Sequence, residues 1–340
     1  MYFLSVDGGA TKTISVVYNQ NSEILGVGIS GSTNLRNVGL TGFKRNLKNS
    51  VLKSLHNSGI KDADEYTFAI AGMKDSEKSS SEMIEILSSL FPNRKISYFN
   101  DGEAGFFSRF PDGNGIVVAP GTGMVGYGRV EEKVVRSSGW GWFLDDEGGA
   151  FYIGRRTIQE VVKLFDGRSE FVESSLMGVI REHYSLSDPR DIINKVYGKK
   201  IDIRDIASIA RFTSRESLKG DSLAKTIMED ASEETAKTAI SIYNRLGRPE
   251  QLEFSGYGGV FRSGEWYWEK VKSKIRDSSG NRKFIDPIYG YEAVLGSIVL
   301  TYRREGVYLS GYDIEGLRKV LDDYVFSLPE REKKRYLLID

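Results

Sequence analysis

The chain contains no cysteine and only two histidines, His56 and His183, among its 340 residues. The absence of cysteine excludes disulfides, thiolate nucleophiles, and zinc or iron–sulfur sites with cysteine ligands. Two histidines are too few for a multi-histidine metal site. Both lie in helix-like patterns, which indicates structural roles and argues against a Ser-His-Asp triad.

The chain also lacks a long apolar run, a signal-peptide pattern and an excess of charge of either sign. No segment approaches the ~20 apolar residues that a membrane span requires, and the start has no basic segment followed by an apolar core. With 47 basic and 47 acidic residues, the net charge is zero. Nothing therefore draws the chain to nucleic acid or to an anionic membrane, and we expect a cytoplasmic protein with neither as a partner.

Two nucleotide-binding signatures are missing or incomplete. No segment has the G-x-x-x-x-G-K-[ST] pattern of a P-loop. The pattern G-x-G-x-x-G occurs twice, from Gly26 to Gly31 and from Gly121 to Gly126. A dinucleotide site needs a helix directly after this pattern, and the residues after each match read as a loop or a strand. The sequence therefore disfavours dinucleotide binding.

The sequence does contain the same predicted order of strands and helices in two successive copies. The first copy has strand-like runs, amphipathic helical periodicity and a Ser79-x-x-Glu82 capping box. The second begins after the turn cluster Pro111–Gly115. We predict an α/β protein with duplicated βββαβαβα units and two domains, 1–113 and 114–311. A helical insertion occupies about 150–250, and a C-terminal helix, about 312–328, packs back on the first domain. The predicted elements of the first copy are strands 2–7, 13–19, 23–29, 66–71 and 96–99, and helices over 40–55, 79–90 and 102–109.

The first copy opens on a hairpin, Val6-Asp7-Gly8-Gly9-Ala10-Thr11-Lys12-Thr13. Two glycines allow the backbone to turn tightly and to approach a ligand closely. Hydroxyls and a lysine can bind an anion, and the carboxylate can organise a cation. We interpret the hairpin as a site for the phosphates of ATP with Mg²⁺; the alternative is an ordinary Gly-Gly turn with a surface aspartate.

The second copy opens on a similar turn, Gly121-Thr122-Gly123. Two such turns facing a cleft between domains would hold a polyphosphate from both sides. Asp101 follows the fifth strand, and in open α/β sheets ligands collect where the strands end. We interpret Asp101 as a general base; alternatively, it or Asn100 caps the following helix.

Three further segments combine residues suited to a ligand. The stretch from Gly139 to Gly149 contains aromatic side chains, three acids and four glycines, which suits a sugar pocket, although acids are also common at helix starts. Asn34 follows the third strand and can both donate and accept hydrogen bonds. Ser255–Ser263 reads as a strand, a glycine loop and a helix, where a base could lie against the backbone.

These segments, in this order, make the chain resemble the BadF/BadG/BcrA/BcrD ATPase family, in particular its N-acetylglucosamine kinases and archaeal hexokinases. The resemblance implies a two-domain actin-like (ribonuclease H-like) ATPase fold around an ATP cleft, with ATP and Mg²⁺ as cofactors and a small-molecule sugar as substrate. It also allows a homodimer.

The resemblance implies a role for each matching position. Asp101 would be the catalytic base, and Asp7 would hold Mg²⁺ through a water molecule. The nucleotide would be bound by the two turns and the later glycine loop, that is by Asp7, Gly8, Gly9, Thr11, Lys12, Thr13, Gly121, Thr122, Gly123, Gly256, Gly258 and Gly259. The sugar would be bound by Asn34, Arg36, Asp101, Gly139, Trp140, Gly141 and Asp146.

The chain departs from the family pattern in informative places. The family's dehydratase activators need cysteines for an iron–sulfur cluster, so the chain falls outside that branch. Gly149 stands where the kinases more often have a serine. The expected function is transfer of the γ-phosphoryl group of ATP to a hexose or N-acetylglucosamine. Two alternatives stay open: a 2-keto-3-deoxygluconate kinase, suggested by Arg36, and an ATP-driven conformational switch without a sugar substrate.

Overall fold

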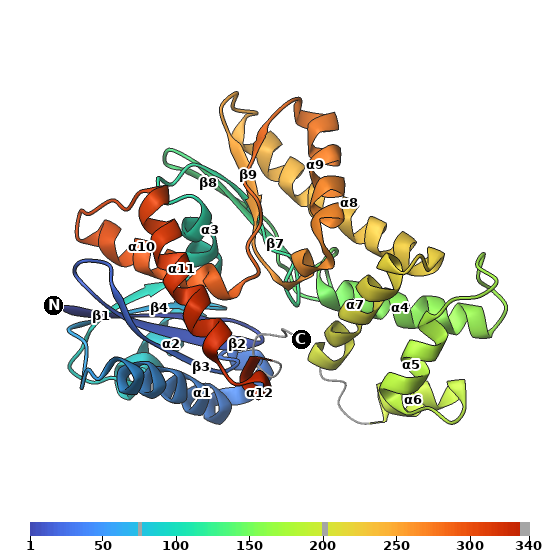
Figure 1. Ribbon diagram of the computed structural model, residues 1–340, viewed down its shortest axis with the longest axis horizontal. Coiled ribbons are helices and arrows are strands. Elements are labelled where there is room, and N and C mark those ends of the chain that lie inside the picture. The colour runs from blue at the N-terminus through green and yellow to red at the C-terminus, as the bar shows by residue number, and fades with distance from the viewer. Residues whose placement is uncertain (74–76, 199–202, 334–340) are drawn as a thin grey trace. The chain divides into compact units, whose positions relative to one another are not determined.

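The protein is described by a computed structural model covering residues 1–73, 77–198 and 203–333. It divides into two compact units (Figure 1). The first contains Met1–Gly115, Arg129–Glu132 and the residues from Gly290 onward; the second contains Ile116–Gly128 and Lys133–Tyr289. Residues 290–311 thus lie in the first unit, and not in the second domain as the sequence predicts.

The first unit contains a five-stranded sheet in the order β3-β2-β1-β4-β5. Strand β1 pairs antiparallel with β2 and parallel with β4, which pairs parallel with β5. The carboxyl ends of β1, β4 and β5 therefore lie at one edge of the sheet, where Asp7 and Asp101 are found. The strands are β1 (Tyr2–Gly8), β2 (Lys12–Asn19), β3 (Ile24–Gly31), β4 (Glu65–Ile70) and β5 (Lys95–Phe99).

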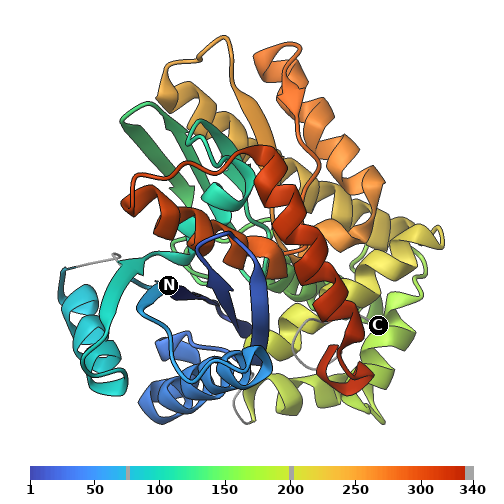
Figure 2. The ribbon, with the colours of Figure 1, turned by 60° about the vertical axis from the view of Figure 1, so that its left-hand side comes forward.

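Helices cover both faces of this sheet (Figures 1 and 2). Helices α1 (Leu35–Ser58) and α2 (Glu77–Leu90) pack on one face, and α3 (Asp101–Arg109) and α10 (Val294–Arg304) on the other. Helix α11 (Gly311–Ser327) contacts β3 and α10, and α12 (Glu330–Glu332) follows it. The capping box predicted at Ser79 is wrong, because α2 already begins at Glu77 and Ser79 lies inside it.

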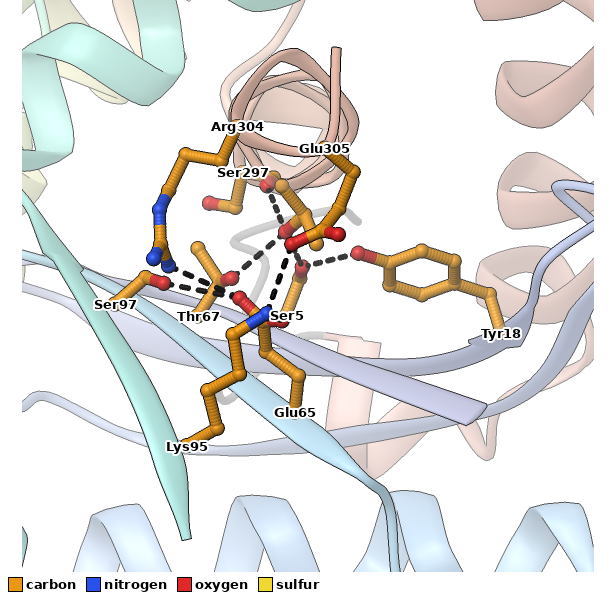
Figure 3. Close-up of polar contacts among 10 residues, drawn as sticks. Ser5, Tyr18, Glu65, Thr67, Lys95, Ser97, Ser297, Arg304 and Glu305 are labelled. Atoms are coloured by element: carbon orange, nitrogen blue, oxygen red, sulfur yellow. Dashed lines mark hydrogen bonds and ion pairs between the residues drawn. The ribbon is translucent and has the colours of Figure 1, made fainter. Parts of the chain in front are cut away.

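Strand β1 presents alternate side chains to the two faces. Leu4 and Val6 belong to the apolar core under α1 and α2, whereas Ser5 faces α10, where its hydroxyl lies 3.3 Å from that of Thr301. Thr301 also lies 2.7 Å from the hydroxyl of Thr67 on β4 (Figure 3). Ser297 donates to the carbonyl of Val6 at 3.3 Å. Helix α10 is therefore hydrogen-bonded to β1 one residue before Asp7.

A buried ion cluster holds the other end of α10. The Glu65 side chain is 0% exposed and lies 2.6 Å from the ammonium group of Lys95 and 3.0 Å from the guanidinium group of Arg304 (Figure 3). Lys95 also pairs with Glu305 at 2.8 Å. A carboxylate buried to this degree is tolerated only when it is paired. These contacts are the physical reason why α10 belongs to the first unit.

The second unit repeats the sheet of the first. Its strand order is β10-β9-β6-β7-β8, so each strand takes the position of its counterpart in the first copy. Strand β6 pairs parallel with β9, which pairs parallel with β10. The predicted duplication of one α/β topology is confirmed. The strands are β6 (Gly115–Val118), β7 (Val125–Val130), β8 (Lys133–Ser138), β9 (Glu253–Gly256) and β10 (Lys283–Phe284).

Most of the second unit's helices lie between β8 and β9 in the sequence. Helix α8 packs against β8, and α9 runs beside α8 in Figures 1 and 2. Helix α4 packs against α5, α7 and α8. The helices are α4 (Ala150–Phe165), α5 (Leu176–Tyr184), α6 (Ile192–Tyr197), α7 (Ile203–Leu218), α8 (Ser222–Leu246) and α9 (Glu265–Ser279), with 3₁₀ turns at Pro189–Asp191, Gly259–Ser263 and, in the first unit, Tyr291–Ala293.

Helices α3 and α10 approach each other so closely that Gly296 cannot carry a side chain. A Cβ atom there would lie 1.7 Å from the carbonyl oxygen of Ala104.

We therefore expect Gly296→Ala to lower the free energy of unfolding by roughly 1–3 kcal/mol, as overpacking typically does. Gly316→Ala in α11 is the matched control, because its Cβ would meet nothing within 4 Å. It should be neutral or stabilising by about 0.5–1 kcal/mol. Urea denaturation of both variants checks this, and equal midpoints would contradict it.

Candidate functional site

The hairpin between β1 and β2 is held in shape by the loop that follows β3. The amide of Gly9 donates to the carbonyl of Lys12 at 3.0 Å, which closes the turn. The carbonyl of Gly9 accepts from the amide of Thr33 at 3.3 Å and from the hydroxyl of Ser32 at 3.0 Å. A Cβ at Gly8 would lie 2.2 Å from Oγ1 of Thr33. Gly8 must therefore be a glycine because Thr33 leaves no room for a side chain, whether or not a ligand is bound.

The hydroxyl of Thr13 faces the protein interior. Thr13 is fully buried, and its Oγ1 lies 2.7 Å from the carbonyl oxygen of Gly31 and 3.0 Å from Oγ1 of Thr33. The sequence predicts that Thr13 binds the nucleotide. Its hydroxyl instead hydrogen-bonds to the end of β3 and to the loop after it, which stabilises the hairpin. Thr11 and Lys12 are half-buried at the turn. The half-buried hydroxyl of Thr11 is therefore a better candidate for binding phosphate than the buried hydroxyl of Thr13.

Asp7 is a buried carboxyl group at the end of β1. Its residue is 6% exposed, and desolvation raises its pKa to about 7. The positive charge of Lys12 lowers this pKa, and the negative charge of Asp101 raises it further. Because Asp7 and Asp101 influence each other's charge, the first unit brings together the two carboxylates that the sequence placed on separate strands.

The structure settles which residue caps α3. The side chain of Asn100 accepts from the amide of Gly102 at 2.8 Å, and Glu103 accepts from the amide of Asn100 at 2.8 Å, which forms a capping box. Asn100 also donates to the carbonyl of Met73 at 2.7 Å. Asn100 is therefore the cap, and the half-buried Asp101 occupies the first position of the helix, beside Asp7.

Two of the three predicted sugar-binding residues of the first unit lie at the start of α1. Asn34 caps this helix, with its side-chain oxygen accepting from the amide of Arg36 at 3.1 Å. The amide of Asn34 donates to Ser32 at 3.0 Å, so Asn34 is tied to the same loop that shapes the hairpin. Arg36 is exposed, as expected for an arginine at the start of a surface helix.

In the second unit, the turn Gly121-Thr122-Gly123 joins β6 to β7 and is hydrogen-bonded to the start of α4. The amides of Ala150 and Phe151 donate to the carbonyls of Gly121 and Thr122, each at 2.9 Å. A Cβ at Gly149 would lie 2.6 Å from the carbonyl carbon and oxygen of Gly123. The missing hydroxyl at Gly149 therefore has a steric cause, because this backbone passes directly against the turn.

Asp146 packs on the other side of the same turn. A Cβ at Gly123 would lie 2.2 Å from its carboxylate oxygen, and the amide of Gly141 donates to it at 3.3 Å. Burial raises the pKa of Asp146 to about 6, opposed by the hydrogen bond from Gly141 and assisted by the nearby charge of Asp145. The predicted sugar-binding loop and the predicted phosphate turn are thus in direct contact.

The loop from Gly139 to Gly141 presents Trp140 to solvent, with 78% of the residue exposed. Gly139 and Gly141 have φ angles of +84° and +98°, which glycine adopts without strain. Asp145 accepts from the hydroxyl of Ser138 at 2.9 Å and from the amide of Trp140 at 3.1 Å. Burial raises the pKa of Asp145, but these hydrogen bonds outweigh it and hold the pKa below its usual value.

The three glycines of the later loop have different surroundings. A Cβ at Gly256 would lie 2.4 Å from the ring of Phe261, and one at Gly258 would lie 2.6 Å from the carbonyl oxygen of Pro120. Gly258 also has a φ of +139°. Gly259 is exposed and would meet nothing within 4 Å. Gly256 and Gly258 therefore shape the loop and the turn, and Gly259 has room for a ligand.

Sequence reasoning missed the supporting contacts. The roles of Thr33, Pro120 and Gly149 depend on close backbone approaches between distant segments, and no local pattern reveals them. Asp145 was visible only as one acid among three. The described residues contain no group of three or more His, Cys, Asp or Glu side chains arranged to hold a metal ion. None of the described helices is long and apolar enough to cross a membrane.

The raised pKa of Asp7 predicts a pH dependence of stability. The folded protein keeps the proton up to a pH of about 7, whereas the unfolded chain loses it near 3.8. The contribution to stability is therefore complete below the unfolded value and is lost as the pH rises towards 7, at about 1.4 kcal/mol per pH unit. Asp7→Asn should abolish this loss and be more stable than the wild type above that pH.

Urea denaturation of both proteins from about pH 5 to about pH 8 measures this difference. The wild-type free energy of unfolding should fall relative to that of Asp7→Asn as the pH rises towards about 7, and the difference should level off above it. A constant difference between the two proteins would contradict the assigned environment of Asp7.

Comparisons with known proteins agree with these features. The model of the BadF/BadG/BcrA/BcrD ATPase family matches residues 4–301. An N-acetylmuramic acid/N-acetylglucosamine kinase of Clostridium acetobutylicum is 27% identical over 80% of this chain and 89% of the relative. An N-acetyl-D-glucosamine kinase of Dictyostelium discoideum is 25% identical over 74% and 82%.

A solved structure supports the fold independently. A Chromobacterium violaceum protein, described as a proposed N-acetylglucosamine kinase, superimposes with a TM-score of 0.71 at 19% identity, covering 88% of this chain and 98% of that chain. The fold class is thus the actin-like ATPase fold that the sequence predicted. Because the family model spans most of the chain, the protein belongs to the BadF/BadG/BcrA/BcrD ATPase family.

Proposed function

We propose that this protein is an ATP-dependent sugar kinase that transfers the γ-phosphoryl group to a hydroxyl of a hexose or an N-acetylhexosamine. The observation that carries the proposal is the pair of carboxylates at one sheet edge, Asp7 and Asp101, beside a glycine hairpin. Family membership and the names of the curated relatives support the same reaction class.

The residues present fit a bound Mg²⁺. Mg²⁺ in phosphoryl-transfer sites keeps several waters and uses one or two carboxylates together with substrate phosphates. Asp7 is a buried carboxyl whose pKa is raised by burial and by Asp101, so a cation nearby would favour its ionised form. The metal would neutralise phosphate charge, and Asp7 would hold it through a water molecule.

The first unit supplies the base. Asp101 would orient the attacking sugar hydroxyl and accept its proton, a contribution of typically ~10²–10⁴-fold. Asn100 caps α3, and the hydrogen bond that Oδ1 of Asp101 accepts from the amide of Gly102 at 3.0 Å would orient the carboxylate. The backbone of Gly8 and Gly9, with Thr11 and Lys12, would bind phosphate oxygens. Phosphoryl transfer relies mainly on such positioning and charge stabilisation.

The second unit supplies the second phosphate turn, Gly121-Thr122-Gly123, and Gly259 as the open position for adenosine. In the second unit, the sugar would be bound by Asp146 and the Gly139–Gly141 loop; Asn34 is the corresponding candidate of the first unit. Asp146 contacts the phosphate turn directly at Gly123, so a sugar bound to Asp146 would lie beside the phosphate being transferred.

Neither alternative has comparable support. A sugar-acid kinase was suggested by Arg36, which is an exposed residue at a helix start. A nucleotide switch that binds no sugar would need neither a base at Asp101 nor a sugar-binding loop at Trp140. The curated relatives carry the names of an N-acetylmuramic acid/N-acetylglucosamine kinase and an N-acetyl-D-glucosamine kinase. These names favour an N-acetylhexosamine as substrate, and the first of them includes a sugar that carries a carboxylate.

Substitution of Asp101 tests the proposal. Asp101→Asn should bind ATP as the wild type does and lose ~10²–10⁴-fold in kcat, because no group then accepts the hydroxyl proton. Asp112→Asn, in the exposed turn after α3, is the matched control and should keep full activity. ADP release with glucose, N-acetylglucosamine, N-acetylmannosamine and 2-keto-3-deoxygluconate provides the measurement. Near-wild-type kcat in Asp101→Asn would overturn the base assignment, and no stimulation by any sugar would overturn the function.

A further inference from the structure

The second unit contains a polar cavity of about 310 Å³ beside the loop that carries Asp146. Its walls come from the end of β8, from the Gly139–Gly149 loop and from one face of α8. Asp146 itself is not among the lining residues. The side chains that define the cavity are Ser138, Trp140, Asp145, Glu147, Glu234 and Lys237.

The cavity is built before any ligand arrives. Asp145 is fixed by hydrogen bonds from Ser138 at 2.9 Å and from the amide of Trp140 at 3.1 Å. Glu234 and Lys237 pair at 2.7 Å on α8. Arg136 donates to the carbonyl of Gly139 at 2.7 Å, which anchors the loop to β8. These contacts reduce the ordering cost of binding.

The chemistry of the lining suits a sugar ring. An exposed indole offers a flat apolar face, and Trp140 is the most exposed tryptophan of the chain. Carboxylate oxygens accept hydrogen bonds, and the lysine and serine donate them, which matches a ring with several hydroxyl groups. Three carboxylates against one ammonium group leave the cavity negative, so a ligand with its own carboxylate would be repelled.

We propose that this cavity is an accessory carbohydrate subsite of the second unit, which binds a neutral or amino-bearing sugar ring that is not itself phosphorylated. Trp140 lines this subsite, and the amide of its neighbour Gly141 donates to Asp146 at 3.3 Å. The ring belongs either to a free monosaccharide or to the second unit of a disaccharide whose first ring reacts. The inference rests on the proposed kinase function for the residues around Asp146.

The subsite has a consequence for the neighbouring loop. A ring held against Trp140 and Asp145 contacts the same loop whose Gly141 amide donates to Asp146. A disaccharide that contacts both Asp146 and the subsite would therefore bind more tightly than a monosaccharide. A uronic acid or another sugar carrying a carboxylate should gain nothing from the subsite.

Calorimetric titration without ATP tests this inference, with N-acetylglucosamine, its β-1,4-linked disaccharide and a glucuronic acid as probes. Glu234→Gln removes a carboxylate from the cavity. Glu233→Gln is the matched control, because Glu233 neighbours it on α8, is exposed and pairs with Lys274 at 3.5 Å outside the cavity. A melting curve for each variant verifies that it is folded.

If a free monosaccharide is the ligand, the wild type and Glu233→Gln should bind two equivalents of N-acetylglucosamine, and Glu234→Gln should bind one. If a disaccharide is the ligand, the wild type should bind it about tenfold more tightly than the monosaccharide, a difference of about 1.4 kcal/mol, and Glu234→Gln should lose this preference. In both cases Glu234→Gln should keep its kcat with the monosaccharide.

One equivalent of monosaccharide with no preference for the disaccharide in the wild type would overturn the subsite and leave the kinase proposal standing. Equal effects of Glu233→Gln and Glu234→Gln, or tightest binding of the uronic acid, would also overturn it. Failure of all three sugars to bind and to stimulate ADP release would overturn the kinase proposal together with the subsite.

Discussion

The candidate site depends on one constraint: at several glycines the backbone lies so close to neighbouring atoms that no side chain fits. At Gly8 the hairpin of the first unit passes against Thr33, and at Gly149 and Gly258 two distant segments pass against the Pro120–Gly123 turn. A β-carbon at any of these positions would overlap its neighbour, so the turns keep their shape only if these residues stay glycine. At Gly8, Gly123 and Gly258, three positions predicted to bind ligand, neighbouring atoms of the protein leave no room for a side chain.

The second constraint is electrostatic. Parallel pairing of β1, β4 and β5 brings Asp7 and Asp101 to one edge of a sheet, where burial and mutual repulsion favour a proton on Asp7. The hydrogen bonds from α10 to Ser5 and Val6 fix the strand just before Asp7. An unfavourable pair of carboxylates is thus maintained by packing elsewhere, and such a pair is what a cation and a phosphoryl group would stabilise.

The sequence predicted the duplicated topology because strand and helix periodicity are local signals, and each predicted strand of the first sheet was found. It left the cap of α3 open between Asn100 and Asp101, since both can cap. Both side chains accept from the amide of Gly102, and only the capping box between Asn100 and Glu103 decides. It assigned Thr13 to a ligand because the burial of a hydroxyl cannot be read from one strand. It placed α10 in the wrong unit because the Glu65 cluster joins residues distant in the chain.

The central claim is that the γ-phosphoryl group is transferred to a sugar and not to water. Phosphorus-31 NMR of the wild-type protein with MgATP and N-acetylglucosamine observes both products directly. The account predicts a sugar phosphomonoester that accumulates in step with ADP, with little inorganic phosphate. Inorganic phosphate as the main product, formed at the same rate with and without sugar, would contradict it.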